Sequence, residues 1–184
     1  MNKKDFPIFK NHDNLIYFDS AASSHKPQSV LDAINNFYTK GYSNVHRGNY
    51  TLSEYSTDLF ENSRRTIAKF INAEPEEIIF TSGTTGSINM LAQSLAQIIG
   101  NDTIVSTIME HHSNFIPWQQ LAIKNKSDFR ITGIKDDYTL DTDQLYEFIE
   151  KDEPAALAIT QMSNVLGTIN PIKDIIQSPL KMFP

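Results

Sequence analysis

Hydrophobic positions along this chain alternate between a helical spacing and short continuous runs. Apolar side chains three or four positions apart predict amphipathic helices, and short apolar runs bounded by turn residues predict strands. Helices are expected at 27–41, 53–71, 88–99, 115–124, 142–149 and 171–176, and strands at 15–19, 77–81, 103–107, 129–134 and 155–161. Strands separated by helices predict an α/β layered fold with a largely parallel sheet.

Single residues refine the predicted helix boundaries. Pro27 and Pro117 suit the first turn of a helix, where a missing N–H costs nothing. Ser53 suits an N-cap, and Gly41 is expected to end the helix that Pro27 opens.

The turn after the predicted strand 77–81 suits an anion. In parallel sheets, ligands bind beyond the carboxyl ends of the strands. Here Ser82-Gly-Thr-Thr-Gly86 leads directly into a helix, whose first N–H groups and dipole favour a phosphate. The hydroxyls of Thr84 and Thr85 would add donors. An ordinary helix cap explains the same residues equally well.

Two later strand exits carry polar side chains. His111 and His112 lack the His-Glu-x-x-His spacing of a zinc helix, so no metal site is expected. One imidazole could stack on an aromatic ligand, or the two could be loop histidines, one buried and one exposed. Asn164 could donate a hydrogen bond to a phenolate-type oxygen, or form an Asx turn.

A further polar stretch, 44–48, lies outside the strand exits. His46 could transfer protons and Arg47 could bind an anion. A solvated loop without either role is the alternative.

Composition narrows the function classes. The 184 residues carry a formal net charge of -6, which argues against nonspecific nucleic-acid binding. Because the chain has no cysteine, it holds no disulfide, thiolate metal site or cysteine nucleophile. The polar N-terminus and the lack of any apolar run of about 18 residues predict a cytoplasmic protein that does not contact a membrane.

Taken together, the polar motifs resemble the class V aminotransferase family, and within it the SufS-type (group II) cysteine desulfurases, also called selenocysteine lyases. The resemblance covers about residues 14–176. The motifs are Asp19-Ser-Ala-Ala-Ser23, Asn44-Val-His-Arg-Gly48, Thr51-Leu-Ser53, Phe80-Thr-Ser-Gly-Thr-Thr85, Met109-Glu-His-His112, Asn114, Pro117-Trp118 and Ser163-Asn-Val-Leu-Gly-Thr168.

The resemblance implies the type I fold of enzymes that depend on pyridoxal 5'-phosphate (PLP), with a large α/β/α domain and a mostly parallel sheet. Family members are homodimers that convert L-cysteine to L-alanine and pass persulfide sulfur to an acceptor for iron–sulfur cluster assembly. The expected division is an N-terminal segment with the first helix (1–45), part of the PLP-binding large domain (46–176) and a divergent tail (177–184).

The resemblance also assigns cofactor contacts. Thr84 and Thr85 would hold the PLP phosphate, and His112 would stack on the pyridine ring and assist proton transfer. Asn164 would bond the phenolic oxygen and lie near the substrate carboxylate.

Substrate contacts are implied for residues nearer the N-terminus. Ala22 would line the substrate pocket, His46 would act catalytically from the rim, and Arg47 would bind substrate near the dimer interface. Many relatives have Arg in place of Ser82 and an acidic residue in place of Gly86, so charge pairing at the dimer-facing side is expected to be weaker here.

The family's later landmarks have no counterpart in residues 1–184: the cofactor lysine in Ser-x-His-Lys, the aspartate at the pyridine nitrogen, the persulfide cysteine and the carboxylate-binding arginine. We therefore expect an incomplete large domain, truncated before the cofactor lysine and without desulfurase turnover on its own. Alternatives are a non-catalytic half-fold that pairs with another chain, an acyl-adenylate-forming enzyme suggested by 81–86, and a sulfinate desulfinase or other class V enzyme.

Overall fold

The computed structural model describes residues 2–12 and 14–177. The chain divides into two compact units, Met1–Phe80 and Thr81–Pro184, which are described in turn. Of the predicted tail, 177–184, residues 178–184 lie outside the described residues, and the predicted domain bounds stay a prediction. Across the described ranges, no helix is long and apolar enough to cross a membrane.

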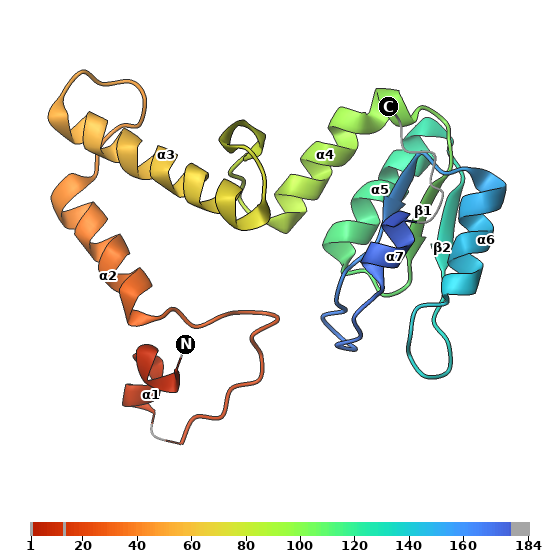
Figure 1. Cartoon of the computed structure of the whole chain (residues 1–184), viewed down its shortest axis with the longest axis horizontal. Helices are drawn as coiled ribbons and strands as arrows, with labels where there is room; N and C mark the ends of the chain where they lie inside the picture. The colour runs from red at the N-terminus through yellow and green to blue at the C-terminus, as the bar shows by residue number, and fades with distance from the viewer. Residues whose placement is uncertain (1, 13, 178–184) are drawn as a thin grey trace. The chain divides into compact units, whose positions relative to one another are not determined.

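The first unit is helical in its described part (Figure 1). It contains a 3-10 turn, Lys3–Asp5, the short helix α1, Ile8–Asn11, and the longer helices α2, Gln28–Asn36, and α3, Thr51–Ile71. A π-helical turn, Phe37–Gly41, extends α2, and a 3-10 turn, Pro75–Glu77, follows α3. Gly41 ends the helical segment as predicted, and Pro27 is the N-cap of α2 instead of a first-turn residue.

Helix α3 is tied to the segment before it by two buried serines. Ser53 donates from Oγ to the carbonyl oxygen of Asn44 (2.8 Å), and Ser56 donates to that of Gly41 (2.8 Å). The prediction of Ser53 as N-cap is therefore wrong. Tyr50 is the N-cap, and the hydroxyl of Ser53 points to a loop instead of the helix start. A Cβ at Gly41 would lie 2.1 Å from the Tyr55 ring, so this close approach requires glycine.

The predicted strands at 15–19 and 77–81 are wrong. Residues 15–19 pair with no other strand in the described chain, and Ile16 and Phe18 are 77% and 94% exposed. Ile78 has extended backbone angles, but Ile79 after it is 69% exposed and the segment is likewise unpaired. An apolar run becomes a strand only where a neighbouring backbone pairs with it, and the run itself does not reveal that partner.

The second unit alternates helices and strands as predicted. Its helices are α4, Thr84–Ile99, α5, His112–Asn125, α6, Thr142–Asp152, and α7, Ile172–Gln177. Its strands are β1, Ile104–Thr107, β2, Phe129–Thr132, and β3, Ala156–Ala158. They form a three-stranded parallel sheet in the order β2-β1-β3, so the α/β fold with a parallel sheet is confirmed.

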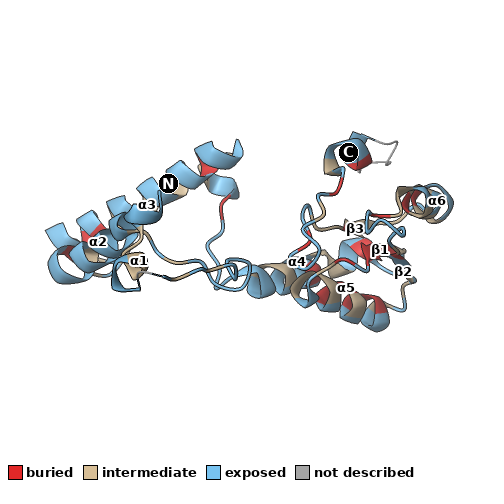
Figure 2. Cartoon of the chain, turned by 90° about the horizontal axis from the view of Figure 1, so that it is seen from below, coloured by how far each residue is buried: buried red, intermediate tan, exposed pale blue. Residues whose placement is uncertain are grey.

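Two apolar clusters cover the two faces of this sheet. On one, Ile104 of β1 is buried with Ala92 and Ile99 of α4 and Trp118 of α5. On the other, Val105 packs with residues of α6 and α7, which are Leu145, Ile149 and Ile175. Because successive strand residues point to opposite faces, β1 supplies both clusters. Figure 2 shows the buried residues concentrated in this unit, whereas every residue of α2 is exposed.

Two helices of this unit begin earlier than predicted. Helix α4 begins at Thr84, so the predicted phosphate-binding turn is already its first turn. Helix α5 begins at His112, which places Pro117 inside the helix instead of in its first turn. His111 explains the earlier start of α5, because its side chain caps that helix.

The connection from β2 to α6 is held by local polar contacts. Hydrogen bonds donated by Thr139 lower the pKa of Asp137, and the hydrogen bond to Asp143 raises the pKa of Lys135. These groups are exposed, and none of them is a predicted site residue.

Candidate cofactor-binding site

The first predicted contact region is the N-terminus of α4. Gly83 precedes the helix with a φ of 129°, a conformation that favours glycine, and no side chain caps the helix there. The first backbone bond runs from Ser87 N–H to Gly83 C=O (3.0 Å), so the N–H groups of Thr84, Thr85 and Gly86 have no intrahelical acceptor. Both threonine hydroxyls are exposed and have no hydrogen-bond partner among the described residues. This donor set fits a phosphate.

The loop entering α4 is fixed by its own side chains. Thr81 and Ser87 lie 2.7 Å apart through their hydroxyl oxygens, and Ser87 also donates to Gly83 C=O (3.1 Å). A Cβ at Gly86 would lie 2.9 Å from the Ser82 hydroxyl oxygen. Ser82 and Gly86, the two positions at which the family resemblance leads us to expect charged residues, are thus neighbours in space.

The two adjacent histidines after β1 differ in their contacts. His111 Nδ1 accepts a hydrogen bond from Ser113 N–H (3.1 Å) and lies 2.8 Å from Ser113 Oγ, so this ring caps α5. His112 is the first residue of α5, and its ring touches that of His111 at a centroid distance of 6.3 Å. It has no hydrogen bond to the described residues. The predicted alternative of one buried and one exposed histidine is wrong, because both are exposed.

Asn164 lies in a closed loop after β3. The hydroxyl of buried Ser163 accepts hydrogen bonds from the N–H groups of Val165 (3.3 Å) and Leu166 (3.1 Å). Ser163 N–H also bonds to Thr168 C=O (3.0 Å). Ser163 therefore makes the turn that the Asx alternative assigned to Asn164. The Asn164 side chain is exposed and has no hydrogen bond within the described chain.

Glu110 joins the exits of β1 and β3. Its Oε1 accepts from the Thr107 hydroxyl (2.7 Å) and from Thr160 N–H (2.7 Å), and its Oε2 accepts from Asn114 Nδ2 (2.7 Å). Sequence reasoning did not assign this residue a role. The available signal was an acidic residue at a strand exit directly before the histidine pair.

Helices α4 and α5 run in the same direction. Asn125, at the end of α5, donates from Nδ2 to the carbonyl oxygens of Ala96 (2.8 Å) and Gly100 (2.6 Å) at the end of α4. The N-terminal ends of both helices therefore lie at the edge of the sheet where β1 ends. The structure thus brings Thr84, Thr85, His112 and the loop of Asn164 to one edge of the second unit.

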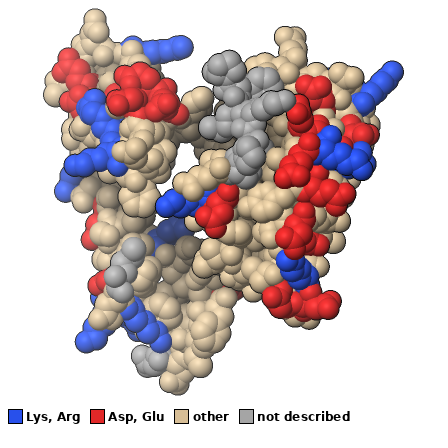
Figure 3. Space-filling model, turned by 45° about the vertical axis from the view of Figure 1, so that its right-hand side comes forward, with Lys and Arg blue, Asp and Glu red and all other residues tan. Residues whose placement is uncertain are grey.

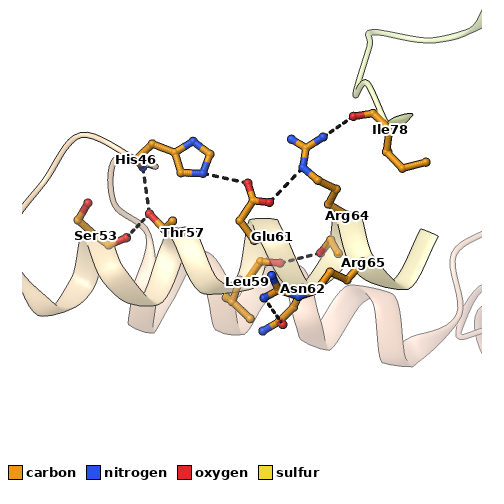
Figure 4. A network of polar contacts seen from close by, with 10 residues as sticks. His46, Ser53, Thr57, Leu59, Glu61, Asn62, Arg64, Arg65 and Ile78 are labelled. Atoms are coloured by element: carbon orange, nitrogen blue, oxygen red, sulfur yellow. Dashed lines mark hydrogen bonds and ion pairs between the residues drawn. The ribbon is translucent and has the colours of Figure 1, made fainter. Parts of the chain in front are cut away.

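The other predicted site residues belong to the first unit. Ala22 is exposed in a turn in which its N–H bonds to Asp19 C=O (3.1 Å). His46 has a φ of 65°, and its Nε2 lies 2.9 Å from Glu61 Oε1 (Figure 4). Arg47 is exposed. The roles of Ala22, His46 and Arg47 stay predictions.

The contacts of His46 form a small network on α3. Its N–H donates to Thr57 Oγ1 (2.9 Å), and Glu61 Oε2 accepts from Arg64 Nε (3.1 Å). Arg64 also donates to Ile78 C=O (Figure 4). Its guanidinium group lies over the rings of Phe60 and Phe80. His46 is thus an exposed loop residue whose ring and backbone both contact α3.

Charged side chains are spread over the described residues, 2–12 and 14–177. No group of three or more histidine, cysteine, aspartate or glutamate side chains in that part of the chain could hold a metal ion. Figure 3 shows acidic and basic side chains on one face with wide uncharged areas between them.

Comparisons with known proteins identify the family of this chain. The model of the family described as aminotransferase class V matches residues 16–180. Cysteine desulfurases of Cronobacter sakazakii and of an Enterobacter species are each 44% identical over 180 residues, which are 95% of this chain and 44% of each relative. The chain therefore spans less than half the length of these relatives.

Solved structures give the same result. The apo structure of a cysteine desulfurase from Thermococcus onnurineus matches 94% of this chain and 42% of its own, with a TM-score of 0.84 and 38% identity. The cysteine desulfurase CsdA of Escherichia coli matches 95% of this chain and 44% of its own, with a TM-score of 0.78 and 32% identity.

Proposed function

The chain belongs to the class V aminotransferase family, which is PLP-dependent, and we propose that it forms the part of a cysteine desulfurase that binds the phosphate and ring of PLP. One observation carries this proposal. At one edge of the parallel sheet, Thr84, Thr85, His112 and Asn164 are exposed and make no hydrogen bonds to the described residues through their side chains. Their neighbours Glu110, His111 and Ser163 make the hydrogen bonds that fix the loops.

Each of these four side chains suits one part of the cofactor. The helix start at Thr84 and Thr85 supplies N–H and O–H donors for the phosphate. The flat imidazole of His112 would stack on the pyridine ring, and it could move a proton at a nearby substrate atom. The Asn164 amide would donate to the phenolic oxygen. When bound, PLP supplies an electron sink for reactions of an amino-acid substrate.

The substrate and assembly follow from the family resemblance. We assign L-cysteine as substrate, with Ala22, Arg47 and Asn164 near it and His46 as a proton-transfer group. The 2.9 Å contact between His46 Nε2 and Glu61 Oε1 supports the assignment of His46, because a carboxylate partner orients an imidazole. The assignment includes a cytoplasmic homodimer that passes sulfur to an acceptor protein.

The phosphate contact can be tested by replacing both threonines with valine. In T84V/T85V, the two hydroxyl donors are lost and the helix start remains. We expect the affinity for PLP and for inorganic phosphate to fall by about a hundredfold or more, because each lost hydrogen bond to a charged group contributes about 1.5 kcal/mol or more. Isothermal titration and the NMR shifts of the Thr84–Gly86 amides measure it.

S94A is the matched control, since Ser94 lies further along α4 and its hydroxyl bonds only within the helix, to Met90 C=O (2.9 Å). Equal affinities of T84V/T85V and S94A for phosphate would exclude the hydroxyls of Thr84 and Thr85 as phosphate donors.

A further inference from the structure

We infer that Glu110 is a positioning residue of the cofactor site. Glu110 holds the exit of β3 against the start of α5 and so sets the spacing between Asn164 and His112. This inference rests on the proposed function and adds to it a residue that does not itself touch the cofactor. The link spans 50 positions of sequence, between Glu110 and Thr160.

The contacts around Glu110 all require an acceptor. Thr107 and Thr160 donate to one carboxylate oxygen, and Asn114 donates to the other. Trp118 fixes the orientation of Asn114, because the indole N–H, which can only donate, bonds to Asn114 Oδ1 (3.1 Å). The amide of Asn114 must therefore present its NH₂ group to Glu110.

This arrangement distinguishes a carboxylate from its closest neutral analogue. In E110Q, the new amide can keep its oxygen toward Thr107 and Thr160 only by turning its NH₂ group toward the NH₂ group of Asn114. Turning the amide around instead places its NH₂ group against Thr160 N–H. Either orientation opposes two donors, and flipping Asn114 would leave the Trp118 N–H without its acceptor.

Short hydrogen-bonded segments connect Glu110 to both predicted cofactor contacts, His112 and Asn164. On one side, His112 begins the helix that His111 caps, directly after Glu110 in the chain. On the other side, Thr160 C=O accepts from Asn170 Nδ2 (2.8 Å), and Gln161 C=O accepts from Asn170 N–H (2.8 Å). These bonds and the Ser163 turn close the loop that carries Asn164.

Three variants of the 184-residue chain test the inference. E110Q introduces the opposed donors. E110Q/N114D restores the pairing, because the new carboxylate at position 114 accepts hydrogen bonds from both the new amide and Trp118. The double variant also has the same net charge as the parent chain. E150Q is the control for lost charge, since Glu150 is an exposed residue of α6.

The first readout needs no ligand. We expect E110Q to speed amide hydrogen exchange at Thr160 by about tenfold and to broaden the NMR signals of the Asn164 side chain, while E110Q/N114D and E150Q match the parent chain. The second readout is binding. E110Q should raise the Kd for PLP about tenfold and leave the Kd for inorganic phosphate within about twofold, because the α4 site is separate.

The outcomes separate the inference from the proposed function. Any one of three results would overturn the positioning role. They are unchanged hydrogen exchange at Thr160 in E110Q, equal losses of PLP and phosphate affinity in E110Q, and a PLP affinity in E110Q/N114D that stays as low as in E110Q. If E110Q does not fold, the double variant decides, because it must fold and bind PLP like the parent chain. A different result would separate the two proposals. If E110Q speeds exchange at Thr160 as expected but the parent chain binds neither PLP nor phosphate, the link made by Glu110 is supported and the cofactor site is overturned.

Discussion

The adjacent histidines His111 and His112 make different contacts. His111 accepts a backbone N–H at the start of α5, whereas His112 has no hydrogen bond to the described chain. We expect H111A to lower the free energy of unfolding by about 1 kcal/mol, the usual cost of a lost N-cap, and H112A to change it by less than about 0.5 kcal/mol. Urea unfolding measures both.

The affinity for PLP should change in the opposite order. H112A removes the stacking ring and is expected to weaken PLP binding about tenfold, whereas H111A should bind PLP nearly as well as the parent chain once both are folded. Equal stability losses in the two variants would contradict the assignment of His111 as the cap.

The division of tasks at this scale could not be read from the sequence. Motif spacing indicated Thr84, Thr85, His112 and Asn164 as candidates, and all four lie at one edge of the second unit. The turn after β3, however, is made by Ser163, and the acceptor that joins two strand exits is Glu110. The role of Glu110 depends on the N–H group of Thr160, which lies 50 positions away along the chain, so local sequence could not show it.

Among the elements, α3 carries a buried contact that predicts a measurable cost. Ser56 is 1% exposed and donates to Gly41 C=O. S56A should leave this carbonyl oxygen without its partner and lower the free energy of unfolding by about 1–2 kcal/mol. Thermal or urea unfolding, followed by helical circular dichroism, gives the value.

Ser63 provides the matched comparison on the same helix. It is exposed, and its hydroxyl bonds back to Leu59 C=O (2.8 Å). S63A should be neutral or slightly stabilising, because alanine has the higher helix propensity. If S56A were as stable as S63A, the hydrogen bond to Gly41 would not hold α2 and α3 together.

The elements of the second unit were easier to predict than those of the first. The apolar runs of β1, β2 and β3 alternate with helical patterns. Each of these strands therefore has a parallel partner among the other strands of the same series. Residues 15–19 and 78–81 have the same apolar character and no partner strand in the described chain. Pairing is a property of two segments, which explains why period and composition were insufficient there.

For the molecule as a whole, we expect no desulfurase activity from the 184-residue polypeptide alone. The chain contains no cysteine to carry persulfide sulfur, and the family's cofactor-lysine motif does not occur in it. Incubation with PLP and L-cysteine should release no sulfide or alanine above a protein-free control. Enzymatic release of both products in equal amounts would contradict this expectation.

The order of the strands also determines when the sheet can form during synthesis. The central strand β1 pairs with β2 and β3, and both are made after it. Between Thr107 and Ala158 the ribosome adds about 50 residues, which takes about 3–10 s at about 5–20 residues per second. For this interval Ile104 and Val105, both fully buried in the finished fold, lack one neighbouring strand. The nascent chain therefore passes through a stage in which chaperones have an apolar strand to bind.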